Sequence, residues 1–384
     1  MEILTKELIK ELLSSEQEPF LSLYMPTDRS HPAKLQNPIR FKNLVREMEK
    51  SLLQKYSADE VQEYLEPLET LAKDNNSWNH PKDGLAVFSA KGMFKVVGLN
   101  KTVEELAIVA DSFHTKPLRQ YLQSLDHFYL LGLTLHDIKL FEGNRHFISE
   151  VELTSDTPKT ITEALGDELT DSHTTVASYG GVGGESTGMH HGHGGYKEES
   201  EKDAERFFRV VANAIYEHYS KPTGWNLILA ALPEHHSLFQ KVSKNPFLLP
   251  NGIAINPSSV STEQLAKMAW EVMEPEFNLK LDSLVERFEQ ARANGKGSDD
   301  YKKIAVAAVE GRVDTLLVEA DRIIAVRVTN LVTGNTQKKD LSNPKVDDLL
   351  DDMGELVMKM GGKVMVLPTD KMPSETGMAA IFRF

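Results

Sequence analysis

Residues 300–320 read DYKKIAVAAVEGRVDTLLVEA and predict a helix, 300–312, that leads directly into a strand, 313–320. The same order recurs along the chain, where predicted strands and helices alternate with short connections. Alternation of this kind is typical of α/β layers, because each helix must pack its apolar side against a sheet. The sequence therefore predicts an α/β fold.

The 384 residues are enough for several cores, and we expect three domains. Composition and turn signals place them at residues 1–125, 126–261 and 262–384. The first two are predicted as α/β domains, and the second carries a long Gly/His-rich loop over 171–197.

Several elements follow from local signals. The run 84–99 predicts a hairpin that turns at Lys91-Gly92, and 225–232 predicts a buried strand because its apolar run is continuous. A second hairpin is expected to turn at Glu142-Gly143-Asn144. The helices are predicted at 37–56, 58–73, about 20 residues from near Glu198, 235–244, 262–273, 280–293 and 345–360.

The stretch Tyr179–Tyr196, YGGVGGESTGMHHGHGGY, holds eight of the 24 glycines and three of the 13 histidines. Glycine costs extra backbone entropy to order and offers no side chain to a core. We therefore expect a long mobile loop. Residues 160–196 contain no Lys or Arg, so this loop carries no permanent positive charge.

Composition limits the class of protein. The formal net charge of −14 argues against a general polyanion binder held by charge alone. Without cysteine there is no disulfide or thiolate chemistry. The N-terminus lacks the features of a signal peptide, and no apolar run approaches the roughly 20 residues that span a bilayer. We expect a cytoplasmic protein with no membrane partner and no cofactor.

Candidate chemistry is sparse. Gly184–Gly188 matches G-x-S-x-G, but glycine loop flanks Ser186 where a nucleophile elbow needs a strand and a helix. His190, His191 and His193 are weak metal candidates, because metal sites need ligands on ordered backbone. His235-His236 is expected to lie on the surface at a helix start.

Several fragments, taken in order, resemble the archaeal and eukaryotic class-1 peptide-chain release factors and Pelota. FLSLYMPTDR (20–29), PKDGLAVFSAKG (81–92) and DSFHTKPL (111–118) resemble their N-terminal domain. AAVEGRVDTLLVEAD (307–321), KMGGKVMVLPTD (359–370) and ETGMAAIFRF (375–384) resemble their C-terminal domain. The chain is identified as a member of the bacterial branch of this superfamily, which implies a ribosomal-protein-like α/β/α sandwich at the C-terminus.

The sequence departs from the release factors at the residues that this family uses for peptide release and stop-codon recognition. Where the family has a Gly-Gly-Gln tip, this chain reads Gly192, His193, Gly194, Gly195 and Tyr196. The family's Asn-Ile-Lys-Ser element has no counterpart between Arg29 and Lys50. Its Tyr-x-Cys-x-x-x-Phe element reads Ala107 to Phe113 and keeps only the phenylalanine. Peptide release and stop-codon decoding are therefore not expected.

The resemblance implies a factor for stalled or hibernating ribosomes that binds the A site and has no predicted catalytic residue. The loop tip Gly192–Tyr196 would reach into the ribosome, and the C-terminal domain would contact a translational GTPase such as elongation factor Tu. Two alternatives stay open: a hydrolase of RNA or an ester that uses the loop histidines, and a protein-binding module unrelated to ribosomes. The expected rRNA contacts are Lys34, Arg40, Lys42 and Arg46.

Overall fold

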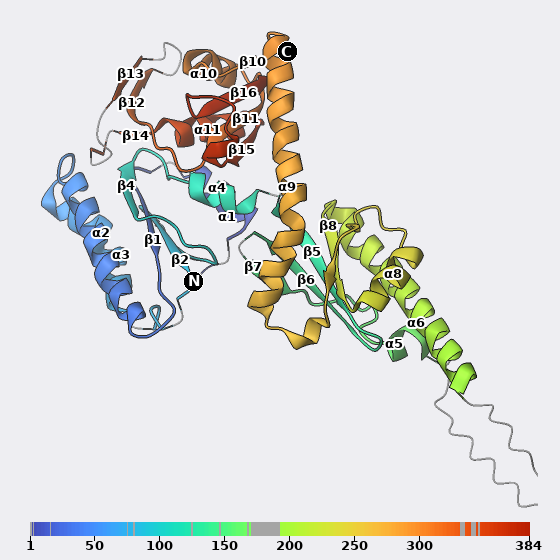
Figure 1. The fold of residues 1–384 in the computed structure, drawn as a ribbon. Helices are drawn as coiled ribbons and strands as arrows, with labels where there is room; N and C mark the ends of the chain where they lie inside the picture. Colours follow the sequence, from blue (N-terminus) through green and yellow to red (C-terminus); the bar gives the residue numbers. More distant parts are fainter. Residues whose placement is uncertain are drawn as a thin grey trace, which may run out of the picture. The chain divides into compact units, whose positions relative to one another are not determined.

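The computed structural model describes residues 2, 4–15, 17–74, 76–79, 81–123, 126–145, 147–166, 169, 193–330, 335–338, 343–344 and 346–384. For residues 6, 122, 193–200, 326–330 and 335–338 it describes the backbone alone. The chain forms two compact units (Figure 1). The first comprises Met1–Ser124 with Asn278–Phe384, and the second comprises Leu125–Phe277.

The N-terminal part of the first unit is built on an antiparallel sheet of order β3-β2-β1-β4. Its strands are β1 (Phe20–Pro26), β2 (Gly84–Ala90), β3 (Met93–Leu99) and β4 (Leu106–Ala110). The predicted hairpin is confirmed: β2 pairs with β3, and Gly92 takes the positive φ of 77° that the turn requires.

Two pairs of helices cover the two faces of this sheet (Figure 1). One face packs Leu21, Leu23 and Met25 against α2 (Asn37–Leu52) and α3 (Ala58–Lys73). The alternate residues Phe20 and Tyr24 pack on the opposite side with α1 (Lys6–Leu13) and α4 (Lys116–Leu122). Because side chains alternate along β1, its residues belong to two separate cores, one on each face of the sheet.

The C-terminal part of this unit has a sheet of order β10-β16-β11-β15, in which β11 and β15 are parallel. The helices α10 (Tyr301–Val309) and α11 (Leu349–Lys359) share one core with it. A small sheet of order β13-β12-β14 lies before α11. The strands are β10 (Gly297–Ser298), β11 (Val313–Glu319), β12 (Ala325–Asn330), β13 (Asn335–Lys338), β14 (Asp347–Asp348), β15 (Lys363–Leu367) and β16 (Met378–Phe382).

One prediction for the chain before α10 is wrong. The two helices expected at 262–273 and 280–293 form a single helix, α9 (Thr262–Ala293), with Pro275 inside it. An internal proline costs about 3 kcal/mol because it removes a backbone hydrogen bond. Met273, Phe277 and Leu281 are spaced by four residues across the proline and are all buried. Their packing stabilises the continuous helix.

The second unit is built on a sheet of order β7-β6-β5-β8-β9. Its helices α6 and α8 pack on one face, and the first part of α9 packs on the other. The strands are β5 (Phe128–Leu133), β6 (Ile138–Asn144), β7 (Phe147–Glu150), β8 (Asn226–Ala231) and β9 (Ile253–Ala254), and the helices are α5 (Ile161–Leu165), α6 (His193–Ile215), the π-helical η4 (Tyr216–Ser220), α7 (Lys221–Thr223) and α8 (Pro233–Val242).

The sequence predicted a turn at Glu142-Gly143-Asn144, but the chain does not turn there. β6 continues through Asn144, and Gly143 pairs with Ile148 of β7. A Cβ at Gly143 would lie 2.6 Å from Ile148 Cγ2, so this glycine permits close packing and does not make the turn.

The predicted mixed α/β fold is confirmed. The division into three domains stays a prediction. The chain forms two compact units, and the N- and C-terminal parts of the first unit each have their own sheet. Within the described ranges, the helices include none with the length and apolarity needed to cross a bilayer.

Candidate nucleic-acid interface

The basic residues predicted to contact RNA lie on η1 (Ala33–Gln36) and α2. α2 buries Phe41, Leu44 and Met48 against the sheet. Because a helix repeats every 3.6 residues, the intervening positions point to solvent. Lys42 and Arg46 are accordingly exposed, while Lys34 in η1 is half-buried.

Arg40 differs from the other three because its guanidinium forms ion pairs with other segments of the fold. Its Nε lies 2.9 Å from a carboxylate oxygen of Glu105, and its Nη1 donates a 2.9 Å hydrogen bond to the carbonyl of Pro26. Asp28 is a further ionic neighbour at 3.6 Å. These contacts tie α2 to β1 and to the segment before β4, so the primary role of Arg40 in the free protein is structural.

The exposed side of η1 and α2 combines charge with apolar surface. Leu35 and Ile39 are 57% and 52% exposed, and they precede Lys42 and Arg46 at helical spacings of four, three and four residues. We call Lys34, Leu35, Ile39, Lys42 and Arg46 the outer face of α2. A face of this kind suits phosphate groups next to sugar or base surface, since lysine and arginine pair with phosphate and aliphatic groups cover apolar atoms.

The predicted loop tip lies at the edge of the described residues. Ser186, His190, His191 and Gly192 fall outside them, as does the expectation of a mobile loop over 171–192. α6 begins at His193 and not near Glu198, so His193, Gly194, Gly195 and Tyr196 form its first residues. The predicted loop boundary at 197 is therefore wrong. No metal-binding group of His, Asp and Glu occurs among the described side chains.

The prediction that His235 and His236 lie on the surface is also wrong. His235 is 9% exposed and packs edge-on against Phe208. His236 Nε2 lies 3.1 Å from the carbonyl oxygens of both Ala231 and Ile253, and thus joins α8 to β8 and β9. Burial lowers the pKa of His235, which keeps its ring neutral in the core.

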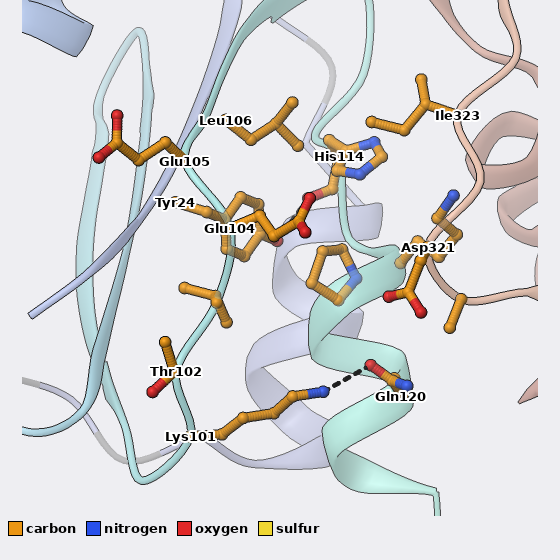
Figure 2. A pocket seen from close by; sticks show the side chains of 14 residues that line it. Tyr24, Lys101, Thr102, Glu104, Glu105, Leu106, His114, Gln120, Asp321 and Ile323 are labelled. Carbon is orange, nitrogen blue, oxygen red and sulfur yellow. Dashed lines mark hydrogen bonds between the residues drawn. The ribbon is translucent and has the colours of Figure 1, made fainter. Parts of the chain in front are cut away.

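The first unit contains a cavity of about 170 Å³ beside β1 and α4 (Figure 2). Its walls come from Tyr24, the segment 101–106, His114, α4 and the residues Ala320, Asp321 and Ile323. Sequence reasoning missed this cavity, because residues far apart in the chain enclose it.

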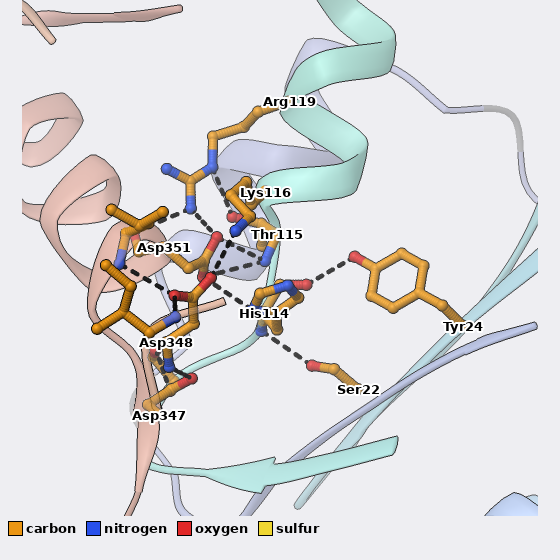
Figure 3. Close-up of polar contacts among 12 residues, drawn as sticks. Ser22, Tyr24, His114, Thr115, Lys116, Arg119, Asp347, Asp348 and Asp351 are labelled. Carbon is orange, nitrogen blue, oxygen red and sulfur yellow. Dashed lines mark hydrogen bonds and ion pairs between the residues drawn. The ribbon is translucent and has the colours of Figure 1, made fainter. Parts of the chain in front are cut away.

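A buried ionic seam lies next to this cavity and joins the N- and C-terminal parts of the first unit (Figure 3). Lys116 Nζ lies 2.7 Å from Asp348 Oδ2, and the two side chains are 2% and 0% exposed. Arg119 pairs with Asp351, which is 0% exposed and also accepts the Thr115 N–H at 3.2 Å. We use the name buried seam for Lys116, Arg119, Asp348 and Asp351.

Burial shifts the pKa values of two titratable groups beside the seam. Burial, and next the charge of Asp351, raise the pKa of Asp347 well above its ordinary value of 3.8. Burial is also the largest effect at His114, where it lowers the pKa below 6.5. Nδ1 of His114 lies 3.9 Å from Asp351 and has no hydrogen-bond partner among the described residues. The imidazole is therefore neutral near pH 7.

Sequence reasoning used residues 111–118 as a fragment that resembles the release factors, and it gave no role to the acids of 347–352. One signal was available: Asp348 opens α11 as an N-cap residue whose side chain accepts the Leu350 N–H. That signal predicts a helix start. It could not predict that the same carboxylate also binds Lys116.

Comparison with known proteins bears on the central part of the chain. The sequence model of bacterial archaeo-eukaryotic release factor family 3 matches residues 127–312. The resemblance predicted from the sequence is confirmed. This match spans just under half of the chain and includes α6 and the whole sheet of the second unit.

Solved structures give weaker likenesses. The archaeal translation termination factor aRF1 is 17% identical, with 98% of this chain and 96% of that chain covered and a TM-score of 0.26. Dom34 of S. cerevisiae is 13% identical, with 76% and 72% covered and a TM-score of 0.39. A ribosome-bound archaeal Pelota is 14% identical, with 76% and 72% covered and a TM-score of 0.40. No curated protein matches the chain.

Proposed function

We propose that this chain is a cytoplasmic factor that binds the A site of stalled or hibernating ribosomes and neither decodes stop codons nor releases peptide. The observation that carries the proposal is the match of residues 127–312 to a release factor family. In that family resemblance, Gly192–Tyr196 occupies the place of the Gly-Gly-Gln tip but ends in tyrosine. Tyrosine lacks the amide and fills the space that a hydrolytic water needs.

The segment that replaces the family's second decoding element supports the absence of codon reading. Ala107 to Ala110 belong to β4, which pairs with β1 in the sheet. Ile108 and Val109 are 0% and 1% exposed, and Phe113 at the end of the element is 2% exposed. Side chains packed in this way are not available to a codon.

The outer face of α2 is the proposed rRNA contact in the N-terminal part. For the C-terminal part we propose contact with a translational GTPase such as elongation factor Tu. Val309, Met360 and Phe384 are 39%, 41% and 72% exposed there. Arg383 binds the carbonyls of Gly311 and Gly361 at 2.9 and 2.7 Å, which brings the ends of α10, α11 and the chain together. An exposed apolar group of this kind is suited to a protein partner.

Co-sedimentation with 70S ribosomes tests the proposal. We expect binding that weakens as salt rises, because phosphate contacts release counterions. The triple variant Lys34→Ala/Lys42→Ala/Arg46→Ala should bind more weakly, and its slope of log K against log salt should fall by up to about 3 units if each residue neutralises one phosphate. Arg40 is left intact because its removal would disturb the fold. The control Lys73→Ala/Lys91→Ala/Lys302→Ala makes the same change in net charge and should bind as the wild type does.

Failure to sediment with ribosomes under growth, starvation and cold stress would reject the proposal. In that case turnover of RNA or an ester substrate would favour the hydrolase alternative. Capture of a non-ribosomal protein would favour the binding module. Peptide release from a stop-codon complex by the wild type would refute the interpretation of Tyr196.

A further inference from the structure

The sequence contains two Asn-Gly pairs, Asn251-Gly252 and Asn294-Gly295. Such a pair can deamidate without an enzyme, because glycine has no side chain to keep its backbone nitrogen away from the asparagine amide. The fold slows this reaction where it holds the reacting groups in hydrogen bonds. The two pairs differ in that respect, so each serves as the comparison for the other.

The pair Asn294-Gly295 directly follows α9 and is tied into the last turn of that helix. The Asn294 amide Nδ2 donates to the carbonyl of Gln290 at 2.9 Å. The Gly295 N–H donates to the carbonyl of Arg292 at 3.1 Å, and Gly295 takes the positive φ of 71° that commonly ends a helix. The nitrogen that would attack and the amide that would leave are therefore both engaged.

The pair Asn251-Gly252 directly precedes β9 and lacks such contacts. Asn251 is exposed. Neither its side chain nor the Gly252 N–H forms a hydrogen bond with a described residue. The preceding Pro250 is held in place, since its carbonyl accepts Gln240 Nε2 at 2.8 Å. Reaction at Asn251 therefore requires no hydrogen bond of the two reacting groups to break.

We propose that Asn251 is a site of spontaneous deamidation. The backbone nitrogen of Gly252 bonds to Cγ of Asn251, the bond from Cγ to Nδ2 breaks, and the proton of that nitrogen leaves with ammonia. Water then opens the succinimide ring. Addition of water at Cγ breaks the new bond and gives aspartate. Addition at the backbone carbonyl carbon breaks the original peptide bond and gives isoaspartate, whose main chain runs through the former side chain.

Isoaspartate at this position would disturb a tightly packed part of the second unit. A Cβ at Gly252 would lie 2.5 Å from both the Leu229 carbonyl oxygen and His236 Cε1, so Gly252 fits closely against β8 and α8. β9 pairs with β8 immediately after this glycine. Because isoaspartate lengthens the main chain by one carbon, we expect it to weaken this pairing. Aspartate at the exposed position 251 adds only a charge and should not.

Peptide mass spectrometry of the full chain, incubated at pH 8, tests the site. Rates measured in urea give the intrinsic reactivity of each pair, and each folded-state rate is divided by its own rate in urea. After this correction Asn294 should react about 30-fold more slowly than Asn251, because two hydrogen bonds must break first. Asn251→Gln should abolish the reaction at that pair and leave Asn294 unchanged.

Amide hydrogen exchange of peptides that cover 226–231 separates the added charge from the added carbon. Protein that carries isoaspartate at 251 should exchange about tenfold faster there, as expected for the loss of about one hydrogen bond. Asn251→Asp has the charge without the extra carbon and should exchange as the unmodified protein does.

The proposal is overturned if Asn251 in the folded protein reacts no faster than Asn294 after correction. Equal exchange in the isoaspartate form and in Asn251→Asp would reject the effect on the pairing of β8 with β9. Neither result depends on ribosome binding, because both measurements use the isolated protein.

Discussion

Lys116→Met breaks one ion pair of the buried seam while it preserves most of the side-chain volume. The ammonium lost by this change lies 2.7 Å from Asp348 and also donates to the carbonyl of Arg322. Asp348 is 0% exposed, so its charge would remain buried without a cation. Removing one partner of such a pair typically costs about 3–5 kcal/mol. This is a large part of the total stability of a domain, about 5–15 kcal/mol.

The expected loss of stability is measured by amide hydrogen exchange of the peptides that cover 113–122 and 346–357. A loss of about 3 kcal/mol corresponds to more than 100-fold faster exchange through opening of the seam. Lys371→Met is the control in the same unit. Its partner Asp282 is also 2.7 Å away, but that pair is 26% and 53% exposed and should contribute at most about 1 kcal/mol.

A double variant separates the buried charge from other effects of the substitution. Asp348 Oδ1 accepts the N–H groups of Ile324 and Leu350, and asparagine retains that oxygen. Lys116→Met/Asp348→Asn should therefore recover part of the lost stability, about 1–3 kcal/mol, because no unpaired charge remains. If Lys116→Met costs less than about 1 kcal/mol, or if the double variant is no more stable than Lys116→Met, the reasoning about the seam is refuted.

Three further predictions concern stability. The folded pKa of Asp347 lies above 3.8, so the folded protein holds this proton more tightly, and the contribution of Asp347 to stability decreases as pH rises from about 4 through the raised pKa. Asp347→Asn should reduce that decrease in urea midpoints measured from pH 4.5 to 8, whereas an unchanged profile would argue against a buried proton. His114 acts in the opposite direction, since its folded pKa is lowered and stability decreases as pH falls below 6.5. Gly252→Ala should destabilise the second unit by about 1–3 kcal/mol, because its Cβ would lie 2.5 Å from both His236 Cε1 and the Leu229 carbonyl oxygen; a melting temperature equal to that of the wild type would contradict this.

The elements that the sequence predicted well are those that local signals determine. The hairpin 84–99 follows from alternating strands and one glycine with positive φ. β8 follows from a continuous apolar run, and its residues 227–231 are all buried. Neither prediction required knowledge of which other segments pack nearby.

The wrong predictions involve residues whose role depends on packing. Gly143 suggested a turn, but the structure uses its missing side chain to admit Ile148. The sequence suggested two helices, 262–273 and 280–293, but buried residues on either side of Pro275 keep α9 continuous. His235 and His236 suggested a polar helix start, and both serve the core. In each case tertiary contacts outweigh a local preference of about 1–3 kcal/mol.

The buried seam and the cavity could not be derived from sequence, because their partners are distant in the chain. Lys116 and Asp348 are 232 residues apart, and each has an unremarkable local context. A lysine near a helix start and an aspartate at an N-cap are usually exposed. Only the fold shows that they form an ion pair in the interior.

The seam also explains why the N-terminal fragment 111–118 can resemble the release factors without a role in codon reading. In the fragment DSFHTKPL, the His114 carbonyl accepts the Tyr24 hydroxyl, the Thr115 N–H binds Asp351, and Lys116 binds Asp348. Phe113 is buried beside Phe20 and Phe88. These residues are engaged in holding the first unit together, so likeness at this fragment is evidence for the fold and not for codon reading. Function must therefore be tested at positions that face solvent, such as the outer face of α2 and the exposed Val309, Met360 and Phe384.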